Sequence, residues 1–546
     1  MYRGNTPART ATRERNSDHR AKARNQSTLA YAHTVSDRTI GKKVLLSFLA
    51  LTLVLLGGAV IVSPLYSAAA ICLVFTALIA LQAFLRVLAV LNSKNSFDIN
   101  TAAASITHWP RYTVLVPLKD EAHMVRELVN KLSCFDYPED RLQILLIVEE
   151  DDPATRRAAM QNLRPPFDCI VVPRTEVNAP RTKPYALNYA MRFARGELIT
   201  IYDAEDHPHP QQLKTAVQAF NTHPNWGALQ APLDYFNAYE TQLSRQFALE
   251  YAAQFHVWIP LMARLGLPFP LGGTSNHIRK TALEDIRQKA MYWDSYNVTE
   301  DADLSFRLSA KGWDIGYITP PTDEEAVAQI KPWGHQRTRW MKGFMQSWLV
   351  HMDAPLLPGG KRGLMRQFTL QITLGTVLLA GFLHTPICLA ALGWTLFQLM
   401  SAGSVSYPSY VYISLLLGYG SGIMMGCVGA YRCGKPRLML SAIFMPFYWL
   451  LLWVPTWRAL YEYSKRPFYW AKTTHGVTTD PAPNVHIAAR QQQNSAKPEV
   501  INGEIKWPQY SSRHGKSAPA LPDKALAARG AQKPLAKTPS KPTAAK

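Results

Sequence analysis

The sequence predicts an α/β domain inserted between transmembrane helices, with a disordered basic tail at each end of the chain. Apolar runs that each approach the length of a membrane-spanning helix flank residues 92–367 on both sides. Between them, short apolar runs alternate with helical stretches, which is typical of a mostly parallel sheet covered on both faces. Residues 1–43 and 481–546 lack the apolar content of a core, so we expect them to be disordered.

The net charge of +20 is concentrated in these two tails. Residues 1–43 hold ten Lys and Arg against three Asp and Glu, and residues 481–546 hold eleven against three. The tails therefore carry +15 of the total, and the rest is only mildly basic, as expected of loops beside a cytosolic leaflet. This distribution argues against nucleic acid as a partner. The six cysteines show no CxxC spacing, so we expect neither a zinc site nor a disulfide framework.

A transmembrane hairpin is predicted over residues 44–91. Val44–Val62 carries no charge, Tyr66–Leu91 carries only one near its end, and a three-residue link joins them. Basic residues such as Lys43 and Lys94 flank the hairpin, and the positive-inside rule then places both of its ends in the cytosol. The domain that follows is therefore expected to be cytosolic, in a multi-pass protein of the cell (inner) membrane.

Residues 92–367 are predicted to form the α/β domain. The expected strands are Tyr112–Leu118, Gln143–Val148, Asp168–Val172, Leu198–Tyr202 and Ala228–Ala231. The expected helices are Glu121–Cys134, Ala154–Leu163, Lys183–Ala194 and Gln211–Phe220. Ligands of such sheets bind at the carboxyl ends of the strands, and acidic residues occur there in this sequence.

The chain is predicted to return to the membrane over residues 368–460. Phe368–Trp394 and Tyr407–Ala430 are long enough to span it. The basic residues within 431–437 should then lie in the cytosol.

Leu438–Leu460 is also apolar, but one more full span would place the basic residues after it outside the cell, against the charge bias. Pro446 and Pro455 each remove a helix hydrogen bond and favour a kink. We therefore expect this segment to enter and return, or to bend onto the inner surface, which gives four full spans in all. The basic and aromatic residues 461–480 are predicted to form a membrane-surface segment.

Two acidic motifs are candidates for chemistry. Asp203 and Glu205 follow the Leu198–Tyr202 strand, and two carboxylates at this spacing can reach one Mg²⁺ or Mn²⁺ across a turn. For an isolated motif of this kind, a polar turn closed by Pro208 is the favoured explanation. Asp301 stands in Thr299-Glu300-Asp301, where a base could deprotonate a hydroxyl. Acids in the first turn of a helix capped by Thr299 are the structural alternative.

Further candidates are weaker when each is taken alone. Asp151 and Asp152 could contact a nucleotide, or could cap the helix that begins at Pro153. Lys183 precedes a helix N-terminus, where a cation and backbone amides favour phosphate.

A helix beside the membrane, near residues 334–352, carries Gln336, Arg339 and Trp340. Arginine suits a diphosphate, and tryptophan suits stacking on a sugar. An interfacial helix with an aromatic anchor is the alternative.

The order of these motifs, DxE, TED and then QxxRW between membrane spans, resembles the processive family 2 glycosyltransferases such as cellulose and hyaluronan synthases. The resemblance covers about Thr113–Trp348 and the flanking spans. It implies a GT-A (Rossmann-like) fold, in which Lys183–Asn188 is similar to a KxxALN segment. It also implies an acceptor-lining loop at Gly272–Asn276, including Gly273 and Thr274.

The resemblance further implies a role for each motif. Asp151 or Asp152 would contact the nucleotide, Asp203 and Glu205 the metal and diphosphate, and Asp301 would be the base. Lys183, Gln336 and Arg339 would bind the donor, while Trp340 would bind the acceptor. The usual DxD is DxE here, which could change the metal preference, and no segment resembles a cyclic-di-GMP-sensing module.

The implied enzyme is an inverting transferase that uses a UDP-sugar and Mg²⁺ or Mn²⁺. Its acceptor would be a growing polysaccharide, which we favour, or a lipid-linked glycan. Its partners would include membrane lipids and accessory export subunits. A non-processive glycolipid transferase and a non-catalytic membrane scaffold or transport protein with a decayed transferase domain are the alternatives.

Overall fold

The structure is a computed structural model, and its residues fall into two units, Met1–Thr479 and Asp480–Lys546. It describes residues 62–92, 106, 108–161, 163–173, 182–288, 291–352, 360–469, 499–501 and 504–506. The basic tail predicted at 1–43 and nearly all of the first predicted span lie outside the described residues. In the second unit, β11 (Glu499–Ile501) pairs antiparallel with β12 (Glu504–Lys506), within a segment that the sequence predicts to be disordered.

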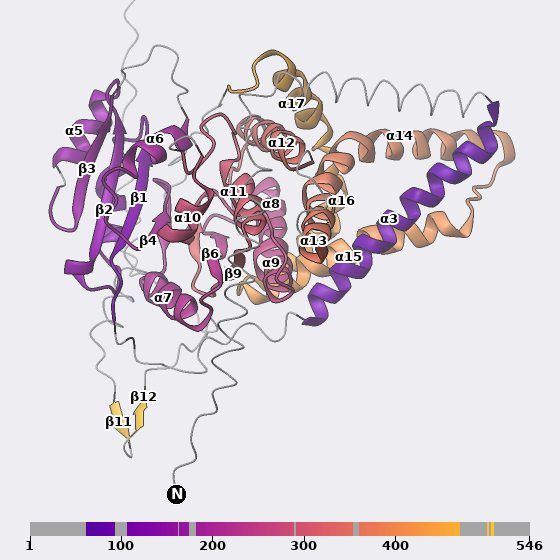
Figure 1. The fold of residues 1–546 in the computed structure, drawn as a ribbon. Coiled ribbons are helices and arrows are strands. Elements are labelled where there is room, and N and C mark those ends of the chain that lie inside the picture. The colour runs from indigo at the N-terminus through magenta and orange to yellow at the C-terminus, as the bar shows by residue number, and fades with distance from the viewer. Residues whose placement is uncertain are drawn as a thin grey trace, which may run out of the picture. The chain divides into compact units, whose positions relative to one another are not determined.

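The first unit is built on a mixed seven-stranded sheet with the order β3-β2-β1-β4-β8-β6-β9 (Figure 1). In that order the strands are Phe167–Val172, Leu142–Glu149, Tyr112–Leu118, Leu198–Ile201, Asn276–Arg279, Trp226–Gln230 and Asp314–Tyr317. All neighbours pair in parallel except β8, which is antiparallel to both β4 and β6. The α/β domain predicted between the apolar segments is therefore confirmed, and β8 and β9 add to the predicted strands.

Alternate side chains of each strand enter the two cores of this domain, as a pleated strand covered on both faces requires. On β1, Val114 and Val116 pack with α4 and α7 on one face, and Leu115 packs with α6 on the other. The helices of the domain are α4 (Val125–Leu132), α5 (Pro153–Gln161), α6 (Lys183–Ala190), α7 (Gln212–Thr222), α8 (Gln242–Ala253), α9 (Ile259–Arg264), α10 (Lys280–Ile286), α11 (Glu300–Ala310) and α12 (Ile330–Met352). A π-helical turn, η4 (Gln254–Trp258), joins α8 to α9.

A second sheet of three very short strands has the order β5-β10-β7 and was not predicted. Its strands are His207–Pro208, Thr322–Glu324 and Leu233–Tyr235. β5 begins directly after the Asp203–Asp206 turn and pairs antiparallel with β10, matching Asp323 to His207. This pairing brings Glu324 beside the DxE motif, although 119 residues separate Glu205 from Glu324 along the chain.

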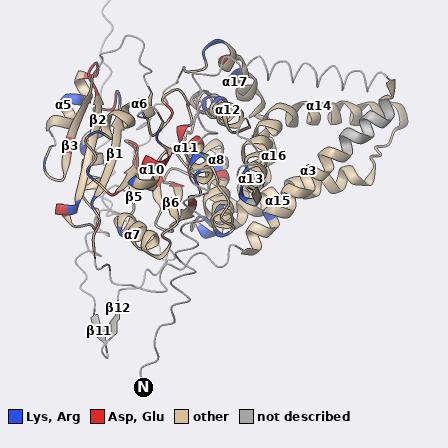
Figure 2. Ribbon diagram, viewed as in Figure 1, with Lys and Arg blue, Asp and Glu red and all other residues tan. Residues whose placement is uncertain are grey.

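Long apolar helices form the membrane region, and they carry little charge in Figure 2. They are α3 (Pro64–Asn92), α14 (Thr376–Ala402) and α15 (Ser409–Arg432), with α13 (Gly360–Leu370) and η5 (Gln371–Gly375) leading into α14. Within the part of the chain that the structure describes, four helical stretches are long and apolar enough to cross a membrane. They are Leu73–Asn92, Arg362–Ala402, Ser409–Arg432 and Pro436–Lys465.

The last of these stretches is broken into η6 (Pro436–Phe444), α16 (Met445–Leu450) and α17 (Trp453–Lys465). Pro446 and Pro455 lie in the first turns of α16 and α17, where a missing amide hydrogen is tolerated. Both ends of the stretch contact the α/β domain. Arg432, just before it, donates to the backbone oxygen of His256 at 3.0 Å, and Glu462, near its end, accepts from Lys342 at 3.1 Å.

Candidate active site

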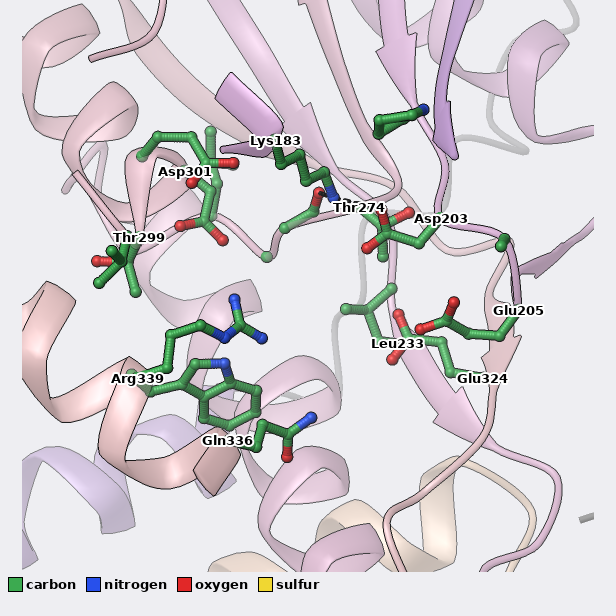
Figure 3. Close-up of a pocket in the computed structure, with 18 of the residues that line it drawn as sticks. Lys183, Asp203, Glu205, Leu233, Thr274, Thr299, Asp301, Glu324, Gln336 and Arg339 are labelled. Atoms are coloured by element: carbon green, nitrogen blue, oxygen red, sulfur yellow. Dashed lines mark hydrogen bonds and ion pairs between the residues drawn. The ribbon is translucent and has the colours of Figure 1, made fainter. Parts of the chain in front are cut away.

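A pocket with a volume of about 280 Å³ opens at the carboxyl ends of β1, β2 and β4. Both sequence-predicted acidic motifs and the QxxRW residues line it. Figure 3 shows Asp301, Lys183 and Arg339 around one end of an open space, with Asp203, Glu205 and Glu324 toward the other. The predicted acceptor-loop residues Gly273 and Thr274 line the same pocket.

The backbone turn at Asp203 is fixed by the buried carboxylate of Asp206. Asp206 accepts from the backbone amide of Asp203 at 2.6 Å and from the hydroxyl of Thr274. Thr274 also donates to the backbone oxygen of Ile201 at 3.1 Å. These contacts tie the DxE turn to the Gly272–Asn276 loop, so two segments that the sequence singled out separately form one wall.

Carboxyl groups crowd this wall. Burial, followed by the charges of Asp203 and Glu121, raises the pKa of Glu205 to about 8. Burial and the neighbouring acids also raise the pKa of Asp206 and of Glu324 well above their ordinary values. The sequence analysis missed Glu324, because a three-residue strand carries no periodic signal. Its place beside the DxE turn comes only from the tertiary pairing of β10 with β5 and β7.

Lys183 is the cation of this wall. Its ammonium donates to Asp203 and, at 2.7 Å, to the backbone oxygen of Gly273. Burial by itself lowers the pKa of Lys183, but the charges of Asp203, Glu300 and Asp206 outweigh burial and raise that pKa above its usual value. The side chain is therefore a fixed positive charge between the DxE turn and the TED motif.

Asp301 lies in the first turn of α11, with its carboxylate in the pocket. Its Oδ1 accepts from the backbone amide of Ala302 at 2.8 Å. Burial raises the pKa of Asp301, while that hydrogen bond and the charges of Lys183 and Arg339 oppose the rise. Burial and the charge of Asp301 raise the pKa of the adjacent Glu300 to about 7. A buried carboxylate with a raised pKa suits a general base near neutral pH.

The QxxRW residues lie on α12, which is embedded in protein rather than resting on a surface. Gln336 is 8% exposed and Lys342 is 1% exposed. The side-chain oxygen of Gln336 is buried without a hydrogen-bond partner among the described residues. Trp340 stacks on Tyr251, with ring centroids 6.1 Å apart. Much of α12 is therefore packed against protein, while its predicted place as an interface helix beside the membrane stays a prediction.

The helices that carry Asp301 and Arg339 are in close contact. A Cβ atom on Gly343 would lie 2.3 Å from Oγ1 of Thr299, so only glycine fits at this crossing. Asn297 donates to the hydroxyl of Ser347 at 2.9 Å, one turn farther along α12. The N-terminus of α11 is thereby fixed against the middle of α12, and the TED and QxxRW motifs have a set separation.

The structure does not bring Asp151 and Asp152 into this pocket. Asp152 is buried and accepts from the amides of Thr155 at 3.0 Å and Asp120 at 2.6 Å, which is the capping alternative. Glu149, at the end of the same strand, lines the pocket instead. A nucleotide contact by Asp151 or Asp152 stays a prediction.

The acidic wall suits a divalent cation that takes some of its oxygen ligands from the protein and others from a bound diphosphate. In the described part of the chain, no group of three or more His, Cys, Asp and Glu side chains could hold a metal unaided. Mg²⁺ commonly takes only one or two carboxylates and completes its shell with substrate phosphates and water. Burial, and after it repulsion from Asp203 and Glu121, raises the pKa of Glu205, and a bound cation would relieve that repulsion.

Comparison with known families decides the class of the protein. The sequence profile of glycosyl transferase family 2 matches residues 113–272, and that of glycosyl transferase family group 2 matches residues 198–461. Residues 113–461 therefore contain glycosyltransferase family 2 domains. The protein is accordingly an enzyme of the hexosyltransferase type, and its mixed sheet is a GT-A (Rossmann-like) fold, as the sequence predicts.

Relatives of this family 2 enzyme include glycolipid and polysaccharide synthases. It is 26% identical over 394 residues to a beta-monoglucosyldiacylglycerol synthase of Synechocystis sp., covering 70% of this chain and 78% of that protein. It is 26% identical over 269 residues to cellulose synthase 2 of Novacetimonas hansenii, covering 47% of this chain but 16% of that protein. The chain spans about half the length of a Nostoc sp. beta-monoglucosyldiacylglycerol synthase, at 28% identity.

Among solved structures, the chain is similar to a mannosyltransferase from Pyrobaculum calidifontis in complex with GDP-Man and Mn²⁺. The sequence identity is 19% and the TM-score is 0.43, with 69% of this chain and 99% of that chain covered. This likeness is too distant to bear on the donor or the metal of the family 2 enzyme described here.

Proposed function

We propose that this family 2 enzyme transfers a sugar, with inversion at C1, from a UDP-sugar to an acceptor hydroxyl at the cytosolic face of the membrane. The observation that supports it best is the shared pocket. A half-buried carboxylate, Asp301, and a half-buried guanidinium, Arg339, line one cavity with the Lys183–Asp203 ion pair. A carboxylate suits the acceptor proton, and the cations suit the diphosphate that leaves.

In the proposed reaction, the acceptor oxygen attacks C1 of the donor sugar as Asp301 takes the hydroxyl proton. The bond from C1 to the diphosphate oxygen breaks, and its electron pair leaves with UDP. Lys183 and Arg339 hold the diphosphate oxygens, and Gln336, whose buried side-chain oxygen has no partner in the described residues, is available to the substrate. Inversion follows because attack and departure occur on opposite faces of the sugar.

Asp203 and Glu205 would hold the divalent cation, Mg²⁺ or Mn²⁺. Bound there, the cation would neutralise charge on the diphosphate. Hard carboxylate oxygens suit either ion.

The orientation in the membrane is part of the proposal. Arg432 contacts His256 of the α/β domain, and Glu462 contacts Lys342, so the Pro436–Lys465 stretch begins and ends beside this domain. At the end of α3, Arg264 donates to the backbone oxygen of Asn92 at 2.6 Å. These contacts support a stretch that returns to the side it came from, in a multi-pass protein whose catalytic domain is cytosolic.

A growing polysaccharide is the proposed acceptor, because the aromatic face of Trp340 lines the pocket and suits stacking on a sugar. A lipid acceptor such as diacylglycerol, whose glycosylation makes a glycolipid, is the second candidate. A beta-monoglucosyldiacylglycerol synthase matches 70% of the chain, and Phe255 and Phe344 add an apolar part to the same wall.

The full-length protein in phospholipid vesicles would test this proposal. UDP release is measured with UDP-glucose, UDP-N-acetylglucosamine and UDP-galactose, with and without dioleoylglycerol in the vesicles. Radiolabel in an ethanol-insoluble product would support a polysaccharide, whereas label extracted with dioleoylglycerol would support the glycolipid alternative. No UDP release from any donor would favour the scaffold alternative and overturn the proposal.

A further inference from the structure

A buried guanidinium lies directly behind the acceptor side of the pocket. Arg337 is on α12, is 4% exposed and does not line the pocket. Its guanidinium carbon lies 4.5 Å from the ring centroid of Phe247 and 4.6 Å from that of Trp340. The rings of Trp333 and Tyr448 are also within 6 Å. A cation packed among aromatic faces gains attraction from each ring quadrupole.

This guanidinium is fixed by a bidentate ion pair with Glu250 on α8. Nη1 donates to Oε1 at 3.1 Å, and Nη2 donates to Oε2. The hydroxyl of Tyr448 accepts from Nη2 at 2.8 Å and donates to Glu250 at 2.9 Å. Burial alone lowers the pKa of Arg337, but Glu250 and the nearby tyrosines outweigh it and raise that pKa, so the charge is permanent. The fork geometry allows little freedom of orientation.

Trp340 packs against both this cation and the aromatic rings of α8. Its ring is 5.9 Å from that of Phe247 and 6.1 Å from that of Tyr251. Unlike Arg337, Trp340 and Tyr251 both line the pocket. The indole that faces the substrate is therefore backed by a charge whose position is set by α8 and by α16 of the membrane region.

We propose that Arg337 is a positioning residue, which holds the indole of Trp340 at the acceptor end of the pocket through its ion pair with Glu250. The inference rests on the acceptor role proposed for Trp340. Arg337, which does not line the pocket, would set the position of the Trp340 indole. Weakening the bidentate ion pair between Arg337 and Glu250 should then impair acceptor use without changing donor binding.

The test compares Arg337→Lys with the unchanged protein in phospholipid vesicles. Lysine keeps the positive charge among the rings but loses the bidentate fork. The first readout is a ratio: the amount of sugar transferred to the acceptor divided by the amount hydrolysed by water. The second is KM for the UDP-sugar that gives the fastest UDP release. We expect the ratio to fall about tenfold, because small displacements of a positioning group cost rate steeply, and the donor KM to stay within about twofold. Glu250→Gln should shift the ratio in the same direction.

A double-mutant cycle separates positioning from general damage. In the Trp340→Ala background, Arg337→Lys should cause no further fall in the ratio, because the group that it positions is gone. The matched control is Arg279→Lys. Arg279 also packs over an aromatic ring, 4.5 Å from Phe220, but lies outside the pocket, and its loss should lower stability without changing the ratio.

Each failure of this test has a distinct meaning. If Trp340→Ala changes the ratio but Arg337→Lys does not, or if the two effects add, positioning by Arg337 is overturned and the proposed function stands. If Trp340→Ala itself leaves the ratio unchanged, the acceptor role of Trp340 and the positioning inference are overturned together.

Discussion

Gly273 and Asp301 lie close together in the lining of the pocket. A Cβ atom added to Gly273 would lie 3.4 Å from Oδ2 of Asp301 and 3.8 Å from the ammonium of Lys183. Those are ordinary van der Waals distances, so an alanine fits without displacing either group. The methyl group would nevertheless occupy space beside the proposed base that the acceptor hydroxyl has to enter.

Gly273→Ala is therefore expected to lower sugar transfer on the order of tenfold while leaving the melting temperature in detergent nearly unchanged. Gly334→Ala is the control, because a Cβ at Gly334 meets nothing within 4 Å. Equal transfer rates for Gly273→Ala and the unchanged enzyme would mean that the acceptor does not pass between Gly273 and Asp301.

Asp301→Asn is expected to reduce sugar transfer by on the order of a hundredfold or more, because the amide cannot take the acceptor proton. The substitution keeps the size of the side chain, so binding of UDP, measured by calorimetry, should change little. Near-normal turnover in this variant would remove Asp301 from the mechanism.

Chelation with EDTA is expected to abolish transfer, and added Mg²⁺ or Mn²⁺ to restore it. Glu205→Asp should retain activity with an altered preference between the two ions, since the carboxylate is withdrawn by one methylene. Binding of Mn²⁺ in the presence of UDP, followed by electron paramagnetic resonance, gives a readout besides activity. Full transfer after thorough chelation is the result that contradicts a metal at this site.

His277 should make the enzyme less stable in acid. It is fully buried, with Nδ1 2.6 Å from the hydroxyl of Tyr112 and Nε2 3.3 Å from the side-chain oxygen of Gln212. Burial lowers its pKa from 6.5 to about 3, so the unfolded chain binds more protons than the folded one between these values. Stability contributed by the neutral ring is present above pH 6.5 and is lost progressively as the pH falls toward 3.

From pH 7 to pH 5 this loss amounts to about 2 kcal/mol for a single histidine. Thermal unfolding followed by tryptophan fluorescence over this range checks it. His277→Asn should be less stable at pH 7 but should show a smaller fall between pH 7 and pH 5. Parallel curves for the two proteins would show that another group controls the acid sensitivity.

The tail after the membrane region should be cytosolic. A reporter that is active only in the cytosol, fused after Gly476, is expected to give full signal, because both ends of the Pro436–Lys465 stretch contact the catalytic domain. A second fusion within residues 403–406, between α14 and α15, should be silent. A silent reporter after Gly476 would require that this stretch crosses the membrane.

Much of the site could be predicted from the sequence because its residues follow strongly patterned elements. Asp203 and Glu205 come at the end of a wholly buried strand, Asp301 lies in the first turn of a helix, and parallel strands gather such ends at one edge. Their meeting in one pocket is therefore a consequence of fold class. Asp151 and Asp152 also follow a strand, yet local capping by Asp152 turns that segment away.

What the sequence could not predict depends on contacts between distant segments. Glu324 reaches the acidic wall through a pairing of two- and three-residue strands, which leave no periodic pattern. The burial of α12 was missed for a related reason. Its basic residues resemble those of a surface helix until Glu250 and Glu462, which lie far from them in the sequence, are seen to neutralise Arg337 and Lys342.

The ion pair of Lys342 with Glu462 also bears on whether catalysis can be separated from the membrane. The two side chains are 1% and 4% exposed, and they come from the active-site helix and from the last membrane segment. A fragment of residues 92–367 would lack α17 and would expose to water the face of α12 that carries Lys342, Met341 and Met345, which pack against that helix. A soluble fragment that retains the whole α/β domain is therefore expected to misfold or aggregate. By the same reasoning, changes in sugar specificity and changes in the membrane segment are not independent during evolution.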